Sequence, residues 1–455
     1  RLLGEGPGQH HPRKGHVVRT SESQSPTDTK LTRIAWLSGR DKHKQFDSLM
    51  HHFNVESLAD CFHHLDGRKA VGIDGVTKAT YGANLDENLQ DLVARMKRMA
   101  YRPGSVRQGR IPKEGQPGAT RPLGISNLED KIVQEMMHRV LERIYEPVFR
   151  DSSYGFRPGR SPHDAIRALS NHLYRNQVQM VIDVDLKSYF DKIDHSLLSS
   201  FLREKIHDER CMRYIHRMFK AGVLAEGEVT YSDEGVPQGS ICSPVFANLF
   251  AHHVIDTWIE DVVQPHCAGR VALFRYADDM VICCQYEQDA HRIRRTLPKR
   301  LAKYNLALNE EKTQMVPFSK RAQKPGGGSP TFSFLGFTFY WGRSRTGAVI
   351  PKLKSEGKRL GRKIQRVNEW ARRVRNQYRL PDIWRRFCAK LRGHVQYYGV
   401  SFNSASVQHF LWSATRILFK WLNRRSQRKS FTWEQFGQFI QAHPLPRARI
   451  CHPLF

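Results

Sequence analysis

Two adjacent carboxylates, Asp278 and Asp279, interrupt an otherwise apolar run in the stretch FRYADDMVICC. The apolar and β-branched residues on both sides predict two strands joined by a tight turn. An aspartate pair at a turn is common at protein surfaces and by itself is weak evidence of function. Here Met280, Val281 and Ile282 predict buried surroundings, in which carboxylates need a charge partner. The stretch therefore predicts a cation-dependent acidic site.

A second acidic site lies earlier in the chain, in the stretch MVIDVDLKSYFDKIDH that follows Gln179. A strand is predicted over 180–186, and Asp183 and Asp185 would share one of its faces because strand side chains alternate. If this strand pairs with the strands beside Asp278 and Asp279, the carboxylates of Asp185, Asp278 and Asp279 come within about 4–6 Å of one another. They then repel each other unless a cation binds. Oxygen donors without nearby His or Cys favour Mg²⁺. Two such ions, about 3.5–4 Å apart, can activate a 3′-hydroxyl and stabilise a leaving oxygen.

The elements that would position these acids predict an α+β fold with helices packed on one face of an antiparallel sheet. Gly and Pro break the β-prone pieces, and apolar residues recur at helical spacing elsewhere. The predicted elements, in chain order, are helices over 30–100, a hairpin over 101–127, helices from 128, a loop and apolar helix over 235–256, a hairpin centred on Gly336, and helices over 352–423 and 433–440.

Charge predicts a polyanionic partner. The 455 residues include 73 Lys and Arg against 44 Asp and Glu, a net charge of +29. Residues 341–455 hold 25 of the basic residues and only four acidic ones, a net +21. This excess is typical of nucleic-acid-binding surfaces. Aromatic residues interleave with the charge and suit stacking on unpaired bases, although a role in helix cores is the interpretation favoured for most of them.

Eight cysteines show neither a CxxC pair nor zinc-ligand spacing, so neither a disulfide framework nor a zinc module is indicated. Apolar runs stay shorter than about 18 residues and the first 30 residues are polar, so neither a membrane span nor a signal peptide is expected. A cytoplasmic, bacterial location is expected, with residues 1–30 as a mobile basic tail.

Six motifs follow one another along the chain: RIPKEG with RPLGI (110–125), SYGFRPGRSPHDA (153–165), DLKSYFDKIDH (185–195), GVPQGS (235–240), YADD (276–279) and FLGF (334–337). They closely resemble those of group II intron-encoded reverse transcriptases, and LRGHVQYYGV (391–400), RRSQ (424–427) and PLPRARICHP (444–453) resemble the maturase region of that family. The resemblance implies a right-hand polymerase that copies RNA into DNA and also binds its own structured intron RNA to assist splicing and retromobility. It implies an N-terminal helical extension and fingers over 31–180, a palm over 181–340 and a basic helical thumb/maturase domain over 341–455.

The same resemblance implies roles for the acidic residues. Asp185 and Asp278 match the ligands of two Mg²⁺ ions, the Leu186 carbonyl completes that set, and Asp279 matches the accessory catalytic acid. Asp183 competes with Asp185 for the first role. The family's spacing to the following aromatic residue selects Asp185.

Further residues are matched to the incoming dNTP, the primer and the RNA. Phe190 resembles the ring that excludes ribonucleotides, with a core Phe as its alternative. Lys113 and Arg121 resemble the residues that hold the triphosphate of the dNTP, and the alternative is that they are ordinary surface cations. Gln238 matches a residue that lines the nucleotide pocket, with an ordinary turn residue as the alternative. Lys312 resembles the lysine that donates a proton to pyrophosphate. The primer grip matches Phe334, Leu335, Gly336 and Phe337, and the expected RNA contacts of the thumb are Arg362, Lys363, Arg366, Arg372, Arg373, Arg424 and Arg425.

Alternatives to this interpretation remain. A splicing factor on an inactive polymerase fold would have lost its acids, whereas Asp185, Asp278 and Asp279 are all present. A host-recruited reverse transcriptase, used in repair or defence, would share the whole catalytic core. Because no Cys/His-rich nuclease module follows the maturase-like segment, we expect no DNA cleavage by this chain. The sequence leaves the oligomeric state open, with a monomer as one alternative.

Overall fold

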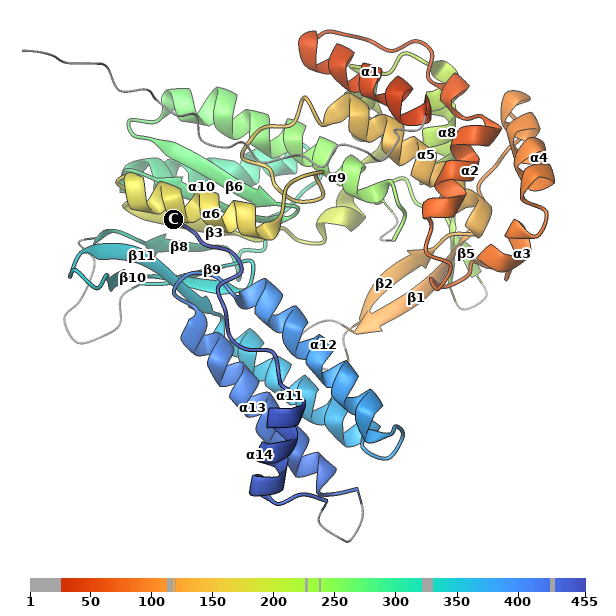
Figure 1. Ribbon diagram of the computed structural model, residues 1–455. Helices are drawn as coiled ribbons and strands as arrows, with labels where there is room; N and C mark the ends of the chain where they lie inside the picture. Colours follow the sequence, from red (N-terminus) through yellow and green to blue (C-terminus); the bar gives the residue numbers. More distant parts are fainter. Residues whose placement is uncertain are drawn as a thin grey trace, which may run out of the picture.

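The computed structural model describes residues 26–112, 118, 120–225, 228–236, 239–320, 330–425 and 430–455 (Figure 1). Most of the predicted N-terminal tail, and two predicted nucleotide contacts, Lys113 and Gln238, lie outside these residues. Within the described part of the chain, helices are too short or too polar to cross a membrane.

The central sheet is antiparallel, with strand order β6-β7-β3-β8. Its strands are β3 (Met180–Val184), β6 (Val271–Tyr276), β7 (Asp279–Cys284) and β8 (Gln314–Pro317). Alternate residues of β3 and β7 enter two different cores, since Ile182 and Ile282 join one cluster while Val181 and Val281 join another. Because both faces are covered, these strands are continuous apolar runs in the sequence.

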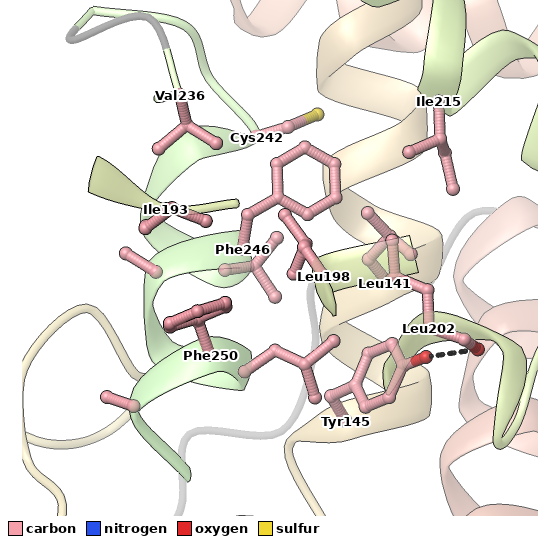
Figure 2. Packing of buried hydrophobic residues seen from close by; sticks show 14 of the residues in the cluster. Leu141, Tyr145, Ile193, Leu198, Leu202, Ile215, Val236, Cys242, Phe246 and Phe250 are labelled. Atoms are coloured by element: carbon pink, nitrogen blue, oxygen red, sulfur yellow. Dashed lines mark hydrogen bonds between the residues drawn. The ribbon is translucent and has the colours of Figure 1, made fainter. Parts of the chain in front are cut away.

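Helices pack on one face of this sheet and form the larger core. They are α5 (Leu128–Tyr145), α7 (His195–Arg203), α8 (Glu209–Phe219), α9 (Ser243–Ala251) and α10 (Glu287–Ala302). Figure 2 shows Phe246 and Phe250 of α9 packed among Leu198 and other apolar residues, with the Tyr145 hydroxyl donating to the Leu202 carbonyl at 2.9 Å. Helix α9 continues through wider π-helical turns over His252–Asp256 and Trp258–Val263, and a short 3₁₀ turn over Gln264–His266 ends it.

The other face is covered by α6 (Pro162–Arg175) and by a second sheet, order β11-β10-β9. Its strands are β9 (Phe332–Phe334), β10 (Phe337–Arg343) and β11 (Val349–Ser355). The expected helix from residue 352 is wrong, because Pro351, Leu353 and Ser355 are buried in strand alternation and pair with β10. Helix α11 (Gly357–Val374) begins only after this strand.

The N-terminal part consists of helices packed beside α5 and a small sheet, order β2-β1-β4-β5. The buried face of α4 is formed by Leu89, Leu92, Val93 and Met96. The elements are α1 (Pro26–Arg40), a 3₁₀ turn (Met50–His52), α2 (Val55–His64), α3 (Lys78–Gly82), α4 (Leu85–Lys97), β1 (Val106–Pro112), β2 (Thr120–Ile125), β4 (Val223–Ala225) and β5 (Glu228–Thr230).

The C-terminal part is a bundle of α11, α12 (Leu380–Tyr398), α13 (Ser404–Leu422) and α14 (Trp433–Ala442). It has its own core, whereas its base, including Val395, Tyr398 and Val407, joins the core beneath the central sheet. The final residues return to that base, where Leu454 is buried. As expected, most of the bundle's aromatics are core residues, and Trp412 and Trp433 are the large exposed exceptions among its described tryptophans.

These three parts are the palm, fingers and thumb of a right-hand polymerase fold, which confirms the predicted fold class (Figure 1). The predicted boundary between palm and thumb, after residue 340, falls inside strand β10 (Phe337–Arg343). The domain boundaries themselves stay a prediction.

Candidate active site

The strand register brings the two acidic segments together. In the β3–β7 ladder Asp183 pairs with Val281 and Val184 with Met280, so the next position places Asp185 opposite Asp279. In the β6–β7 hairpin Tyr276 pairs with Asp279, which leaves Ala277 and Asp278 as a two-residue turn. The two acidic segments therefore converge at the tip of this hairpin.

Asp185 sits at a fixed point beyond the end of β3. Its backbone N–H donates to the Thr313 hydroxyl at 3.2 Å, and its carbonyl accepts from the Asn309 N–H at 2.8 Å. An antiparallel bridge joins Leu186 to Leu308 on the segment that leads into β8. Two backbone connections thus hold the Asp185 backbone, while its carboxylate is left available on the sheet surface.

The electrostatics of the acidic group reflect crowding. Partial burial raises the pKa of Asp183 to about 7, and the charges of Asp279, Asp185 and Glu356 add to this effect. Partial removal of water by the surrounding protein raises the pKa of Asp279 to about 6, and the charge of the neighbouring Asp278 contributes to this rise. The pKa of Asp278 is raised for the same first reason, with Asp185 contributing. Carboxylates that oppose each other's ionisation form a site that favours a cation.

Three basic side chains reach this group from different elements. Lys312 Nζ lies 3.7 Å from Asp185 Oδ2, so the structure brings this predicted residue to the acids. The charge of Arg121, in β2 of the fingers, acts to lower the pKa of Asp278. Arg359 of α11 acts in the same direction on Asp279. Fingers, palm and thumb thus all contribute charge to one site.

A cleft of about 280 Å³ lies against Asp183, Asp185 and Asp279. The FLGF turn between β9 and β10 forms its opposite wall through Phe334, Leu335 and Gly336. Gly336 has φ +81°, and a Cβ there would lie 3.0 Å from Arg359 Nη1, so glycine fits this turn.

The thumb fixes this turn from its outer side. The Tyr397 hydroxyl of α12 donates to the Leu335 carbonyl at 2.9 Å, and the Glu356 N–H donates to the Gly336 carbonyl at 3.0 Å. Phe337 is fully buried beneath the turn, where its ring stacks on Tyr397 with centroids 5.9 Å apart. The predicted primer-grip residues therefore lie beside the acids on a rigid support.

Phe190 lies at the junction of palm and fingers. Its half-buried ring meets Phe156 edge-on with centroids 6.5 Å apart, and its carbonyl accepts the Val236 N–H at 2.9 Å. That bond fixes the backbone just before Gln238, outside the described residues. The role predicted for Phe190 in selecting nucleotides stays a prediction.

The predicted RNA contacts of the thumb divide into exposed and structural residues. Arg366, Arg372 and Arg373 are exposed on α11, and Arg362 is half-buried there. Lys363 Nζ lies 4.3 Å from the Tyr398 ring centroid. Arg424 is exposed at the end of α13, whereas Arg425 donates to the Tyr378 carbonyl at 3.1 Å and so helps close the bundle.

The structure adds a residue that the sequence analysis missed, the fully buried Arg275 of β6. Its Nε and Nη2 atoms donate to Asp256 at 2.7 and 2.6 Å. Nη2 also donates to the Ser153 hydroxyl at 2.7 Å, while Nη1 donates to Asn248 Oδ1 and to the Ala277 carbonyl, both at 3.1 Å. The five guanidinium N–H groups are thereby satisfied, and one of them holds the turn that carries Asp278.

The SYGF segment supports the same turn along the edge of β6. The Tyr154 N–H donates to the Arg275 carbonyl and the Arg275 N–H to the Ser152 carbonyl, both at 2.8 Å. A Cβ on Gly155 would lie 2.4 Å from the Ala277 nitrogen, so only glycine allows this approach. A lone arginine inside the apolar strand VALFRY was the available signal, because a charge there needs a buried partner.

The donor set of this site fits a divalent cation. Its members are carboxylate oxygens whose ionisation is mutually unfavourable, as expected where a hard cation supplies the missing positive charge. Among the described residues, no group of three or more His, Cys, Asp or Glu side chains is arranged to hold a metal ion. The predicted set, Asp185, Asp278 and the Leu186 carbonyl, contains two carboxylates and is smaller than such a group.

Comparison with known proteins agrees with the geometry. Residues 111–339 match the family described as "Reverse transcriptase (RNA-dependent DNA polymerase)". Protein YkfC of Escherichia coli K12 is 40% identical over 186 residues, which are 40% of this chain and 48% of that protein. The group II intron-encoded protein LtrA of Lactococcus lactis is 34% identical over 193 residues, 42% of this chain and 32% of LtrA.

A third relative, an uncharacterised 91 kDa protein in the cob intron of Schizosaccharomyces pombe, is 43% identical over 145 residues, 32% of this chain and 18% of that protein. The matched regions thus span about half of these relatives or less.

Proposed function

Because this chain belongs to the reverse transcriptase (RNA-dependent DNA polymerase) family, we propose that it extends a DNA primer on an RNA template. The convergence of Asp185, Asp278 and Asp279 beside the FLGF turn carries this proposal. Asp185, Asp278 and the Leu186 carbonyl would hold Mg²⁺, with Asp279 as the accessory acid. When bound there, Mg²⁺ would supply the positive charge that favours ionisation of the primer 3′-hydroxyl and stabilises the leaving phosphate.

The chain's own residues supply the rest of the mechanism. Arg121 presents a planar guanidinium that can bind two phosphate oxygens of a dNTP at once. Lys312 pairs with Asp185 at 3.7 Å and is 60% exposed, so it is free to turn toward pyrophosphate and donate a proton. Arg275 and Gly155 keep the hairpin turn in place, so that little reorganisation accompanies each addition.

We further propose that the chain binds a structured group II intron RNA and assists its splicing. LtrA carries the name of a group II intron-encoded protein, and the S. pombe relative lies in an intron. The net +21 of residues 341–455 supports a large RNA contact. Binding should then weaken by orders of magnitude between low and moderate salt, as for about 6–10 neutralised phosphates. An affinity that is flat with salt would contradict this part of the proposal.

The test of the polymerase proposal is primer extension. Purified protein receives an RNA template, an annealed DNA primer, dNTPs and Mg²⁺, with and without flanking intron RNA. We expect extension by the natural chain and none by Asp278→Asn. The matched control is Asp233→Asn, because this aspartate is 91% exposed, pairs with the exposed Lys220 at 3.5 Å and lies outside the acidic group. Extension by Asp278→Asn at the natural rate would refute the assignment.

A further inference from the structure

A pocket of about 760 Å³ lies where α13 ends and α14 begins. Three basic side chains and three aromatic side chains form most of its lining: Arg416, Lys420, Arg424, Phe419, Phe431 and Trp433. Positive charge beside flat, apolar rings is the combination that binds a nucleotide by its phosphate and its base together.

Trp433 is held ready for stacking. Its ring stacks on Phe419 with centroids 3.7 Å apart and an interplanar angle of 20°, and it meets Phe436 at 69°. It nevertheless remains 55% exposed, while Phe436 fills the core at 1%. Because the core below is already filled, Trp433 presents a fixed aromatic surface to the pocket at little entropic cost on binding.

The exposed surface continues along α13. Trp412 is 56% exposed, and Arg416 lies over it at 4.5 Å from its ring centroid. Residues 412, 416, 419 and 420 recur at helical spacing and so share one face of α13, and Arg424 follows just beyond the end of the helix. The pocket is therefore the end of an aromatic and basic stripe rather than an isolated hollow.

The basic side chains of this stripe are not paired with acidic residues in the part of the chain that the structure describes. Among the residues that the structure describes, Arg416, Lys420 and Arg424 form no ion pair with a carboxylate; Lys420 and Arg424 lie over Trp421, at 5.3 and 5.5 Å. One acid, Glu434, is exposed on the first turn of α14. Three cations against one carboxylate leave the pocket positive, as an anionic ligand requires.

We propose that this pocket binds an unpaired nucleotide of a single-stranded nucleic acid. Its base stacks on Trp433, and adjacent phosphates bind Arg416, Lys420 and Arg424. Figure 1 shows α14 at the end of the thumb that is far from the central sheet. The lining residues of this pocket and those of the cleft beside Asp185 are different, so the pocket is a second contact. This proposal depends on the proposed function in one respect: the bound single strand is expected to belong to the RNA partner.

The test begins with photo-crosslinking of the full chain. A single-stranded RNA of about 12 nucleotides, carrying 4-thiouridine, is irradiated with the protein in the presence of saturating primer–template hybrid. We expect crosslinked peptides from residues 412–442, unchanged by the hybrid. Crosslinks confined to other parts of the chain, or abolished when the hybrid is added, would overturn the proposal.

Variants then measure the contribution of the ring. Trp433→Ala should weaken binding of the same RNA by about 5- to 100-fold, the effect of removing one stacked base, while Trp433→Phe keeps most of the affinity. Trp36→Ala is the matched control, because Trp36 is 57% exposed and also lies under an arginine, Arg40, at 5.2 Å. Equal affinities for the natural chain and Trp433→Ala would overturn the proposal.

The charges are tested by salt dependence. Lys420→Gln with Arg424→Gln should reduce the slope of log affinity against log salt by about 0.7 for each phosphate that is no longer neutralised. An unchanged slope would refute their role. A DNA strand of identical sequence distinguishes the two possible sources of the nucleotide. Primer extension on the hybrid is also measured for the natural chain and for every variant. If the natural chain shows no extension but still crosslinks within residues 412–442, the proposed polymerase function is refuted while the proposed nucleotide site is supported.

Discussion

Replacing Arg275 with Met tests whether the buried arginine positions the acidic turn. Arg275 and Asp256 are both 0% exposed and share two hydrogen bonds, at 2.7 and 2.6 Å. Met keeps much of the side-chain length but leaves the Asp256 carboxylate buried without a partner. Breaking a buried pair in this way costs about 3–5 kcal/mol of unfolding free energy. The Ala277 carbonyl is also deprived of its donor.

A double variant separates stability from positioning. In Arg275→Met with Asp256→Leu the unpaired charge is gone, and apolar replacements of buried pairs are often close to neutral. We therefore expect the double variant to recover about 2–4 kcal/mol relative to the single one. In the double variant the Ala277 carbonyl still lacks its hydrogen-bond donor. We therefore expect kcat for primer extension to stay at least about tenfold below that of the natural chain. One missing hydrogen bond at a positioned group changes a rate by about this factor.

Urea unfolding gives the free energies, and single-nucleotide extension gives kcat, KM and the Mg²⁺ concentration for half-maximal rate. A displaced Asp278 should raise the Mg²⁺ requirement, which a purely structural defect would not do. Arg203→Met is the matched control, because its pair with Glu209 is largely exposed and worth under about 1 kcal/mol. Full activity of the double variant, or a cost below about 1 kcal/mol for the single one, would refute the reasoning.

Three other substitutions have defined outcomes. Asp278→Ala should abolish extension while RNA binding, measured by filter retention, changes by less than about twofold, since most of the charge lies elsewhere; joint loss would mean that the two activities are inseparable. Burial raises the pKa of Asp130 to about 6 in the folded chain, so its ionisation should lower the unfolding free energy by about 2–3 kcal/mol as pH rises from about 4 to 6. In Asp130→Asn the fall over this range should be smaller by that amount, and the remainder comes from other acids with raised pKa values, such as Asp183 and Asp279. Gly155→Ala should impair extension because its Cβ meets the Ala277 nitrogen, whereas Gly437→Ala, in open space, should be neutral or slightly stabilising in thermal unfolding.

The sequence predicted the convergence of the acids because its signals there are local and strong. Each strand is a mostly apolar run, and an acidic residue within or at the end of such a run needs a charge partner, which here points to a cation site. Pairing β3 with β7 then brings Asp185 to the hairpin tip that carries Asp278. The FLGF turn was predicted for the same reason, since Gly336 divides two apolar arms.

The Arg275 network could not be predicted in the same way. Its partners come from two other segments that meet β6 only in the folded chain: Asn248 and Asp256 from α9 and its π-helical continuation, and Ser153 from the SYGF segment. Periodicity also fails over the π-helical turns that carry Asp256, because their spacing departs from that of an α-helix. Strand β11 was missed because two lysines and a proline hide its alternation.

The separation of the thumb's two hydrophobic clusters has a mechanical consequence. The base of the bundle shares its core with the palm, and the distal part has a core of its own. Helices α12 and α13 cross without interruption from one cluster to the other. A change in the distance between the distal part of the thumb and the fingers should therefore bend α12 and α13 along their length. Rotation of the whole bundle about a loop is not expected. Long helices curve only gently, so we expect the distal part of the thumb to keep a nearly fixed position relative to the palm.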